Sequence, residues 1–122
     1  MNVSYFVRYD ITAPDLQGFL ERYRKVHAPL VAKWPGLQRM TIHTPIGWDD
    51  PFPVNCGKAA LLAQLEFDTE EAMNQAFASR EYAEAREDFN RCMTFEGNVI
   101  HQAMRTEELW RSPWLDGNEE QA

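Results

Sequence analysis

His27 is the residue whose type and position most favour acid–base chemistry. It follows Tyr23 by four residues and precedes Val31 by four, so on a helix the three side chains share one apolar face. An imidazole on that face can accept and donate a proton near neutral pH. The alternative is a buried histidine that bonds to the backbone and fixes the helix. Pro29 favours either role, because it lacks an N–H and leaves the carbonyl of Lys25 free.

A second group of polar side chains follows the proline–glycine pair at 35–36. Arg39, Thr41 and His43 alternate along a predicted strand, so they point to the same face. They could line a pocket for a carboxylate or a lactone carbonyl, with Arg39 as the anion partner and His43 as a second catalytic group. Equally, they could face solvent at the end of the strand.

The last predicted strand and three aromatic residues supply further candidates for substrate binding. His101 alternates with Val99 and is a candidate for a pocket wall, whereas Asn98 falls on the opposite face. The aromatic candidates could line a pocket or donate to a bound carbonyl: Tyr23, Trp34 and Trp48. For the first two, packing in the core is the alternative role.

No cofactor and no metal are expected. The three histidines lack the spacing of metal ligands, and no carboxylate lies beside them at ligand spacing. The chain has no phosphate-binding glycine-rich loop and no nucleophile elbow centred on serine. Its two cysteines are too few for a disulfide framework or a zinc site. Cys92 is typical of core filling, and Cys56 is a weaker candidate for a reactive thiol.

The hydrophobic pattern predicts the elements that must position these residues. Alternating or β-branched runs predict four strands, at 3–9, 37–44, 59–67 and 95–105. Three-four spacing of apolar residues predicts helices at 15–34, 68–78 and 80–93, the first kinked at Pro29. Residues 45–58, with three prolines, predict a long irregular loop. The order is β-α-β-β-α-β, which predicts an α+β ferredoxin-like fold with helices on one face of a four-stranded antiparallel sheet.

Composition limits the partners. The 122 residues suit one domain, taken as residues 1–115 with a frayed tail at 116–122. A net charge of −7 argues against nucleic acids and anionic membranes. The first residues already have the pattern of a strand, and no apolar run could span a bilayer, so a cytoplasmic protein is expected. The second face of the sheet is too apolar to stay wet, which predicts a homodimer formed by two such sheets.

One stretch of the first helix resembles a known family. The run Tyr23-Arg24-Lys25-Val26-His27-Ala28-Pro29-Leu30 followed by Trp34-Pro35-Gly36-Leu37 is similar to the His-x-Pro-Leu and Pro-Gly-Leu motif of the EthD family. The Phe95-Glu96-Gly97 entry to the last strand resembles the family less specifically. The resemblance covers roughly residues 3–106.

The resemblance implies a dimeric α+β barrel with a pocket between the sheet and helices of each subunit. The family is named after a component of an ether-degradation gene cluster. Relatives in the fold include muconolactone isomerases, cyclases, dehydratases and monooxygenases, and in the isomerases the histidine of the motif faces the substrate. We therefore expect a cofactor-independent enzyme doing proton-transfer chemistry on a small lactone, aromatic or polyketide-like substrate. The alternatives are a monooxygenase-like or haem-binding oxidoreductase and a non-catalytic accessory or ligand-binding dimer.

Overall fold

Four strands and two helical segments follow one another in the order that the sequence predicts. A computed structural model describes residues 2–92 and 94–115, so the predicted tail at 116–122 lies outside the described residues. The strands are β1 (Asn2–Thr12), β2 (Arg39–His43), β3 (Leu61–Phe67) and β4 (Glu96–Thr106). The helices are α1 (Leu16–Arg22), the π-helical turn η1 (Tyr23–His27), α2 (Ala28–Val31), α3 (Glu70–Phe77) and α4 (Arg80–Cys92).

The strands form one antiparallel sheet in the order β2-β3-β1-β4. The long strand β1 lies in the middle and pairs with both β3 and β4, so Val7 lies opposite Ala63 on one side and His101 on the other. This arrangement confirms the predicted ferredoxin-like fold.

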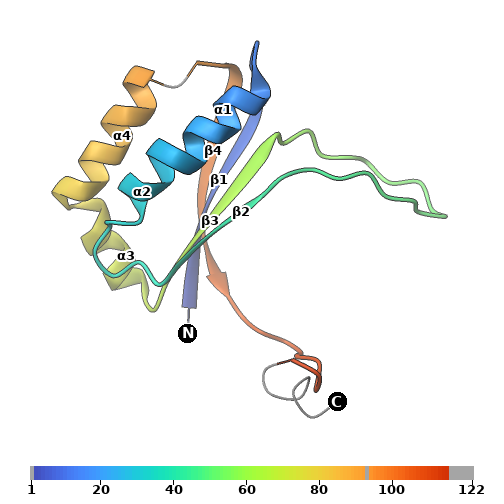
Figure 1. Ribbon diagram of the computed structural model, residues 1–122. Helices are drawn as coiled ribbons and strands as arrows, with labels where there is room; N and C mark the ends of the chain where they lie inside the picture. Colours follow the sequence, from blue (N-terminus) through green and yellow to red (C-terminus); the bar gives the residue numbers. More distant parts are fainter. Residues whose placement is uncertain (1, 93, 116–122) are drawn as a thin grey trace.

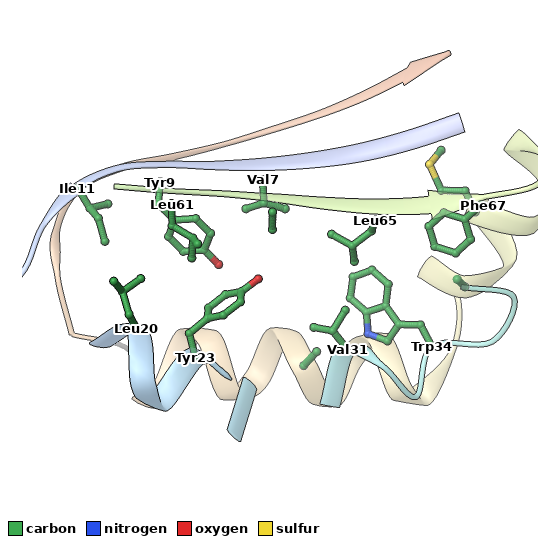
Figure 2. Close-up of a cluster of buried hydrophobic side chains, with 14 of the residues drawn as sticks. Val7, Tyr9, Ile11, Leu20, Tyr23, Val31, Trp34, Leu61, Leu65 and Phe67 are labelled. Carbon is green, nitrogen blue, oxygen red and sulfur yellow. The ribbon is translucent and has the colours of Figure 1, made fainter. Parts of the chain in front are cut away.

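All helices cover the same face of the sheet (Figure 1). Alternation along β1 turns Val3, Val7 and Tyr9 toward the helices, and all three are buried. Figure 2 shows Val7 and Tyr9 facing Tyr23 and Val31 of the first helical segment (α1, η1 and α2) and Trp34, which follows that segment. Within the described ranges, none of the helices combines the length and hydropathy that a membrane span requires.

The opposite face of the sheet, called here the outer face, has no helix over it (Figure 1). Its apolar side chains come from three strands: Phe6, Leu62, Ile100 and Met104. Phe6 and Leu62 are half-buried, whereas Ile100 and Met104 on β4 are 41% and 48% exposed. The predicted apolar second face is therefore present.

Two segments extend away from the sheet. Residues 44–60 form a long arm between β2 and β3 that contains no regular secondary structure and projects beyond the sheet (Figure 1). The arm exposes several large apolar side chains, namely Ile46, Trp48, Phe52 and Val54. The segment after β4 likewise exposes Leu109, Trp110 and Trp114. The predicted irregular loop at 45–58 matches this arm.

Candidate functional site

A widened helical turn carries His27. Asp15 caps the start of α1, its side chain accepting a hydrogen bond from the backbone N–H of Gly18. At the end of η1 the N–H of Ala28 bonds to the carbonyl of Tyr23, five residues back. Pro29 follows directly and cannot donate to the ladder. The kink predicted at Pro29 therefore takes the form of a π-helical turn just before it, with His27 at its last position.

His27 is held by a carboxylate from the other half of the chain. Its Nδ1 lies 3.0 Å from Oδ2 of Asp88, a residue of α4. Asp88 in turn accepts hydrogen bonds from both terminal nitrogens of Arg22, at 3.1 and 2.7 Å. His27 is only 6% exposed. The three side chains form a continuous polar chain between the first helical segment and α4.

The protonation state of this chain follows from its surroundings. Burial lowers the pKa of His27, and this effect outweighs the hydrogen bond to Asp88, which acts in the opposite direction. The hydrogen bonds from Arg22 lower the pKa of Asp88 to about 2. A neutral imidazole must therefore donate its Nδ1 proton to the Asp88 carboxylate. Nε2 of His27 is then the unprotonated nitrogen, able to accept a proton.

A small cavity lies between the sheet and the helices beside His27. Its volume is about 30 Å³, which is room for about two water molecules. The walls are mostly apolar and aromatic and come from β1, the first helical segment, β3, α4 and β4. The lining residues are Tyr5, Val7, Tyr9, Tyr23, His27, Val31, Trp34, Leu65, Tyr82, Ala85, Arg86, Phe89 and His101. Entry of an organic molecule therefore requires side chains to move apart.

A second polar chain lines the cavity between α4 and β4. Nδ1 of His101 lies 2.7 Å from the Tyr5 hydroxyl, and Nε2 of His101 lies 3.4 Å from a terminal nitrogen of Arg86. Burial first, and the Arg86 charge second, lower the pKa of His101. Arg86 and Tyr82 also line a shallow depression on the surface of α4. These two residues therefore contribute to both the cavity and the depression.

Two buried tyrosines lie next to His27. The hydroxyl groups of Tyr9 and Tyr23 point toward each other (Figure 2) and form a hydrogen bond. Burial raises the pKa of both phenols far above neutral pH. The ring of Tyr23 also packs on His27, with ring centres 5.2 Å apart. The phenol side chains at this end of the cavity are therefore neutral, and the imidazole of His27 is the group there that can accept a proton.

Trp34 contributes an unpaired donor. It is 7% exposed, and among the buried polar side-chain atoms of the described residues its Nε1 is the one without a hydrogen-bond partner. Leaving such a group unsatisfied costs about 1–3 kcal/mol. Trp34 also lines the cavity, so a water molecule or a ligand atom there could accept its proton.

The structure brings some of the predicted site residues together and separates others. His27, Tyr23, Trp34 and His101 line the same cavity. Trp48 lies in the projecting arm and is 58% exposed.

Arg39 and His43 lie on the side of the sheet away from this cavity. Their register partners, Glu66 and Leu62, share the outer face. His43 Nε2 lies 3.3 Å from the Gln64 side chain, and Arg39 Nε lies 3.8 Å from Glu66. Thr41 does alternate with them as predicted, but within one chain none of the three reaches His27.

Sequence reasoning missed Asp88, Arg22 and Arg86. The signal for Asp88 was its position three residues after Ala85 and next to Phe89, at the edge of the inward stripe of α4. A carboxylate at that position pairs with the side chains across the helix interface. No comparable signal marks Arg22.

The described residues show no gathering of metal ligands. Within residues 2–92 and 94–115, no group of three histidine, cysteine, aspartate or glutamate side chains converges. Cys56 is exposed in the arm and is not among the residues that line the cavity. The side chain of Cys92 lies outside the described part of the structure.

Solved structures share this fold. An EthD family protein from Bacillus halodurans C-125 superposes with a TM-score of 0.71 at 25% identity, over 88% of this chain and 100% of that one. A dimeric ferredoxin-like protein of unknown function from Thermobifida fusca YX gives 0.63 at 10% identity, over 87% and 92%. SnoaB, a cofactor-independent oxygenase from Streptomyces nogalater, gives 0.57 at 14% identity, over 91% and 98%. At 10% and 14% identity the similarity concerns the fold alone.

The family follows from the sequence match. None of the functionally curated proteins matches the chain. Residues 14–95 match the EthD domain, and this range contains both His27 and Asp88. The match covers more than half of the chain and confirms the resemblance seen in the first helix. The chain belongs to the EthD domain family.

Proposed function

We propose that this protein is a cofactor-independent enzyme that removes a proton from a small lactone, aromatic or polyketide-like substrate, with Nε2 of His27 as the general base. The observation that carries the proposal is the buried chain Arg22–Asp88–His27 beside the cavity. Asp88 fixes the imidazole so that Nε2 is the proton acceptor, because Nδ1 is already occupied as a donor.

The surroundings of His27 suit a base that works near neutral pH. The lowered pKa keeps the imidazole neutral before the reaction. When Nε2 takes the proton, the Asp88 carboxylate stabilises the imidazolium that forms. The mostly apolar walls and the small volume of the cavity limit the water that would compete for the proton. Return of the proton to another carbon gives isomerisation, loss of a leaving group gives dehydration, and attack of the carbanion within the substrate gives cyclisation.

Hydrogen–deuterium exchange tests the base directly, because it does not require the final product. A panel of butenolides and aromatic ketones with acidic C–H groups is incubated with the protein in D₂O and followed by proton NMR. We expect exchange at one C–H position of at least one compound. His27→Gln should slow it by about 100-fold or more, since general base catalysis contributes about that much.

A matched pair of variants on α4 tests the role of Asp88. Asp88→Asn removes the negative charge that stabilises the imidazolium form of His27 and should slow the exchange by at least about tenfold. Glu87→Gln changes the adjacent residue, an exposed carboxylate paired with Arg91, and should leave the rate unchanged. Exchange that is equally fast in His27→Gln and in the unmodified protein would contradict the assignment of the base.

The same base supports a second candidate, a cofactor-independent oxygenase. A carbanion formed at His27 can react with O₂ so that a CH₂ group becomes a carbonyl, with one oxygen atom kept and the other released as water. The fold similarity to SnoaB favours keeping this candidate. An oxygen electrode separates the two: consumption of O₂ equal to the substrate converted supports the oxygenase, and turnover without consumption supports isomerase-type chemistry.

A further inference from the structure

The end of the cavity opposite His27 carries hydrogen-bond donors that have nothing to donate to. Trp34 Nε1 is the first, because it is buried and unpartnered within the described residues. An indole N–H can only donate. What is missing beside it is therefore an acceptor, such as a carbonyl or phenolate oxygen.

The Tyr5 hydroxyl is the second donor, and its direction follows from Arg86. A guanidinium donates and never accepts, so Nε2 of His101 must be the acceptor of the contact with Arg86. A neutral His101 then carries its proton on Nδ1 and donates it to the Tyr5 oxygen. The proton of the Tyr5 hydroxyl remains available for another acceptor. Burial raises the pKa of Tyr5 to about 12, so it keeps this proton at neutral pH.

Trp34 and Tyr5 lie at the same end of the cavity. Both rings pack against Phe77, with centroid distances of 4.8 Å for Tyr5 and 5.9 Å for Trp34. Tyr82 packs on Trp34 at 5.1 Å and on Phe77 at 4.9 Å. The base lies at the other end, where His27 packs against Tyr23 and Phe89.

We propose that Trp34 Nε1–H and the Tyr5 O–H together bind a carbonyl oxygen of the substrate while His27 faces a C–H, conjugated with that carbonyl, of the same molecule. This proposal rests on the proposed function and names the substrate class. When His27 removes the proton, the electron pair of the C–H bond moves through the conjugated system to that oxygen. The oxygen then carries the negative charge, and the two donors stabilise it.

The spacing along the helix favours a ring between the two reacting parts. His27 and Trp34 are seven residues apart, with Val31 between them in the same cavity wall. Residues seven apart on a helix are separated by almost two turns, about 10 Å along the axis, so a molecule that reaches both side chains must extend over several bonds. Adjacent carbon and oxygen atoms are too close together for this, whereas a carbonyl group and a C–H group at opposite ends of a conjugated ring system fit. The substrate class is thus an aromatic or ring-conjugated ketone.

The test uses binding rather than turnover, with the ketone 1-tetralone as the probe and tetralin, the same ring system without the oxygen, as its control. Trp48, Trp110 and Trp114 are exposed, so replacing all three by Phe leaves Trp34 as the single indole signal in a ¹⁵N NMR spectrum of the full chain. We expect 1-tetralone to shift this signal downfield and tetralin to leave its hydrogen bonding unchanged. Tyr5→Phe should weaken binding of 1-tetralone about tenfold without affecting tetralin.

The outcomes separate this proposal from the proposed function. Glu87→Gln should bind 1-tetralone as the unmodified protein does, since Glu87 lies outside the cavity lining and the variant keeps both donors. Absence of a downfield Trp34 shift with 1-tetralone, or equal binding of both probes, would overturn the oxygen-binding role even if deuterium exchange depends on His27. A downfield Trp34 shift, together with deuterium exchange that is as fast in His27→Gln as in the unmodified protein, would instead support the oxygen-binding site and contradict the assignment of His27 as the base. Trp34→Phe is a second variant for the binding measurement. The indole shift is measured in the protein that keeps Trp34, so it does not depend on whether Trp34→Phe folds.

Discussion

At the scale of single residues, the pair His27 and Asp88 illustrates how burial decides a role. An exposed imidazole beside a carboxylate would be protonated more readily, because the negative charge raises its pKa. Here desolvation has the larger effect, and the pKa of His27 falls. The contact is therefore a hydrogen bond from a neutral ring rather than an ion pair. The imidazole is kept as a base, and the carboxylate charge is compensated by Arg22.

The stability of the fold should consequently depend on pH. Because the pKa of His27 is lower in the folded chain, the unfolded chain binds more protons below about pH 6.5, and the free energy of unfolding falls as the pH drops through that value. His101 acts in the same direction. Asp88, with a folded pKa of about 2 against 3.8, adds a further loss as the pH falls below about 4.

Urea titrations at several pH values between 7 and 5 measure this dependence. His27→Gln should flatten the slope in that range, because Gln cannot titrate, and His101→Gln should flatten it as well. The charges that face His27 come from Asp88, Arg22 and Arg86. Stability that rises on acidification from pH 7 to 5 in the unmodified chain, and not in His27→Gln, would contradict the buried neutral imidazole.

The residues that the sequence could predict are those whose role depends on local periodicity. His27, Tyr23 and Trp34 share a helix face, and His101 follows from strand alternation. Asp88 lies 61 residues from His27, and its role depends on how α4 packs on the first helical segment. For Arg39 and His43, alternation shows that they share a face but not which face that is.

At the scale of elements, the strand and helix order was predictable because each apolar pattern has a clear period. The residues at which the strands and helices begin and end were less predictable. β1 runs from Asn2 to Thr12, longer than the predicted 3–9, because it pairs over its whole length with β4. The π-helical turn had only the proline as a signal. Its hydrogen bonds depend on how the turn packs, which the sequence pattern does not reveal.

Gly97 is required where β4 begins. Its φ is +121°, and a Cβ there would lie 2.4 Å from the carbonyl oxygen of Asp10 on β1. Gly97→Ala should therefore lower the free energy of unfolding by about 2 kcal/mol or more, as measured by urea denaturation. Gly47→Ala in the arm is the control: a Cβ there meets nothing within 4 Å. A change below about 0.5 kcal/mol in Gly97→Ala would contradict the tight pairing of β4 with β1 at this point.

At the scale of the whole molecule, the outer face explains why we propose a homodimer. Four apolar side chains lie there without cover from any helix, and the sheet that presents them is antiparallel. Solved proteins of this fold include dimeric ones. Pairing two outer faces would bury Ile100 and Met104 and would also enclose Arg39 and His43 of both chains. Any role of Arg39 and His43 in binding or catalysis would then require the assembled dimer.

A charge on the outer face tests this assembly. Met104→Glu places a carboxylate that is harmless in a monomer, where the side chain is 48% exposed, but is buried in the dimer. We expect native mass spectrometry to find a dimer for the unmodified chain and mostly monomer for Met104→Glu. Val26→Gln, a change of similar exposure on the helical side, should leave the dimer intact. A monomer in the unmodified chain would refute the assembly.

The central position of β1 has a consequence for synthesis of the chain. This strand is made first, yet its partner β4 is made last: the Tyr5 hydroxyl and His101 are 96 residues apart. At about 5–20 residues per second, roughly 5–20 s pass before the ribosome supplies that partner. During this interval one hydrogen-bonding edge of a strongly apolar strand stays unpaired, a state in which nascent chains aggregate or require chaperones. The cavity beside His27 is thus completed only when β4, the last of these four strands in sequence order, has been translated.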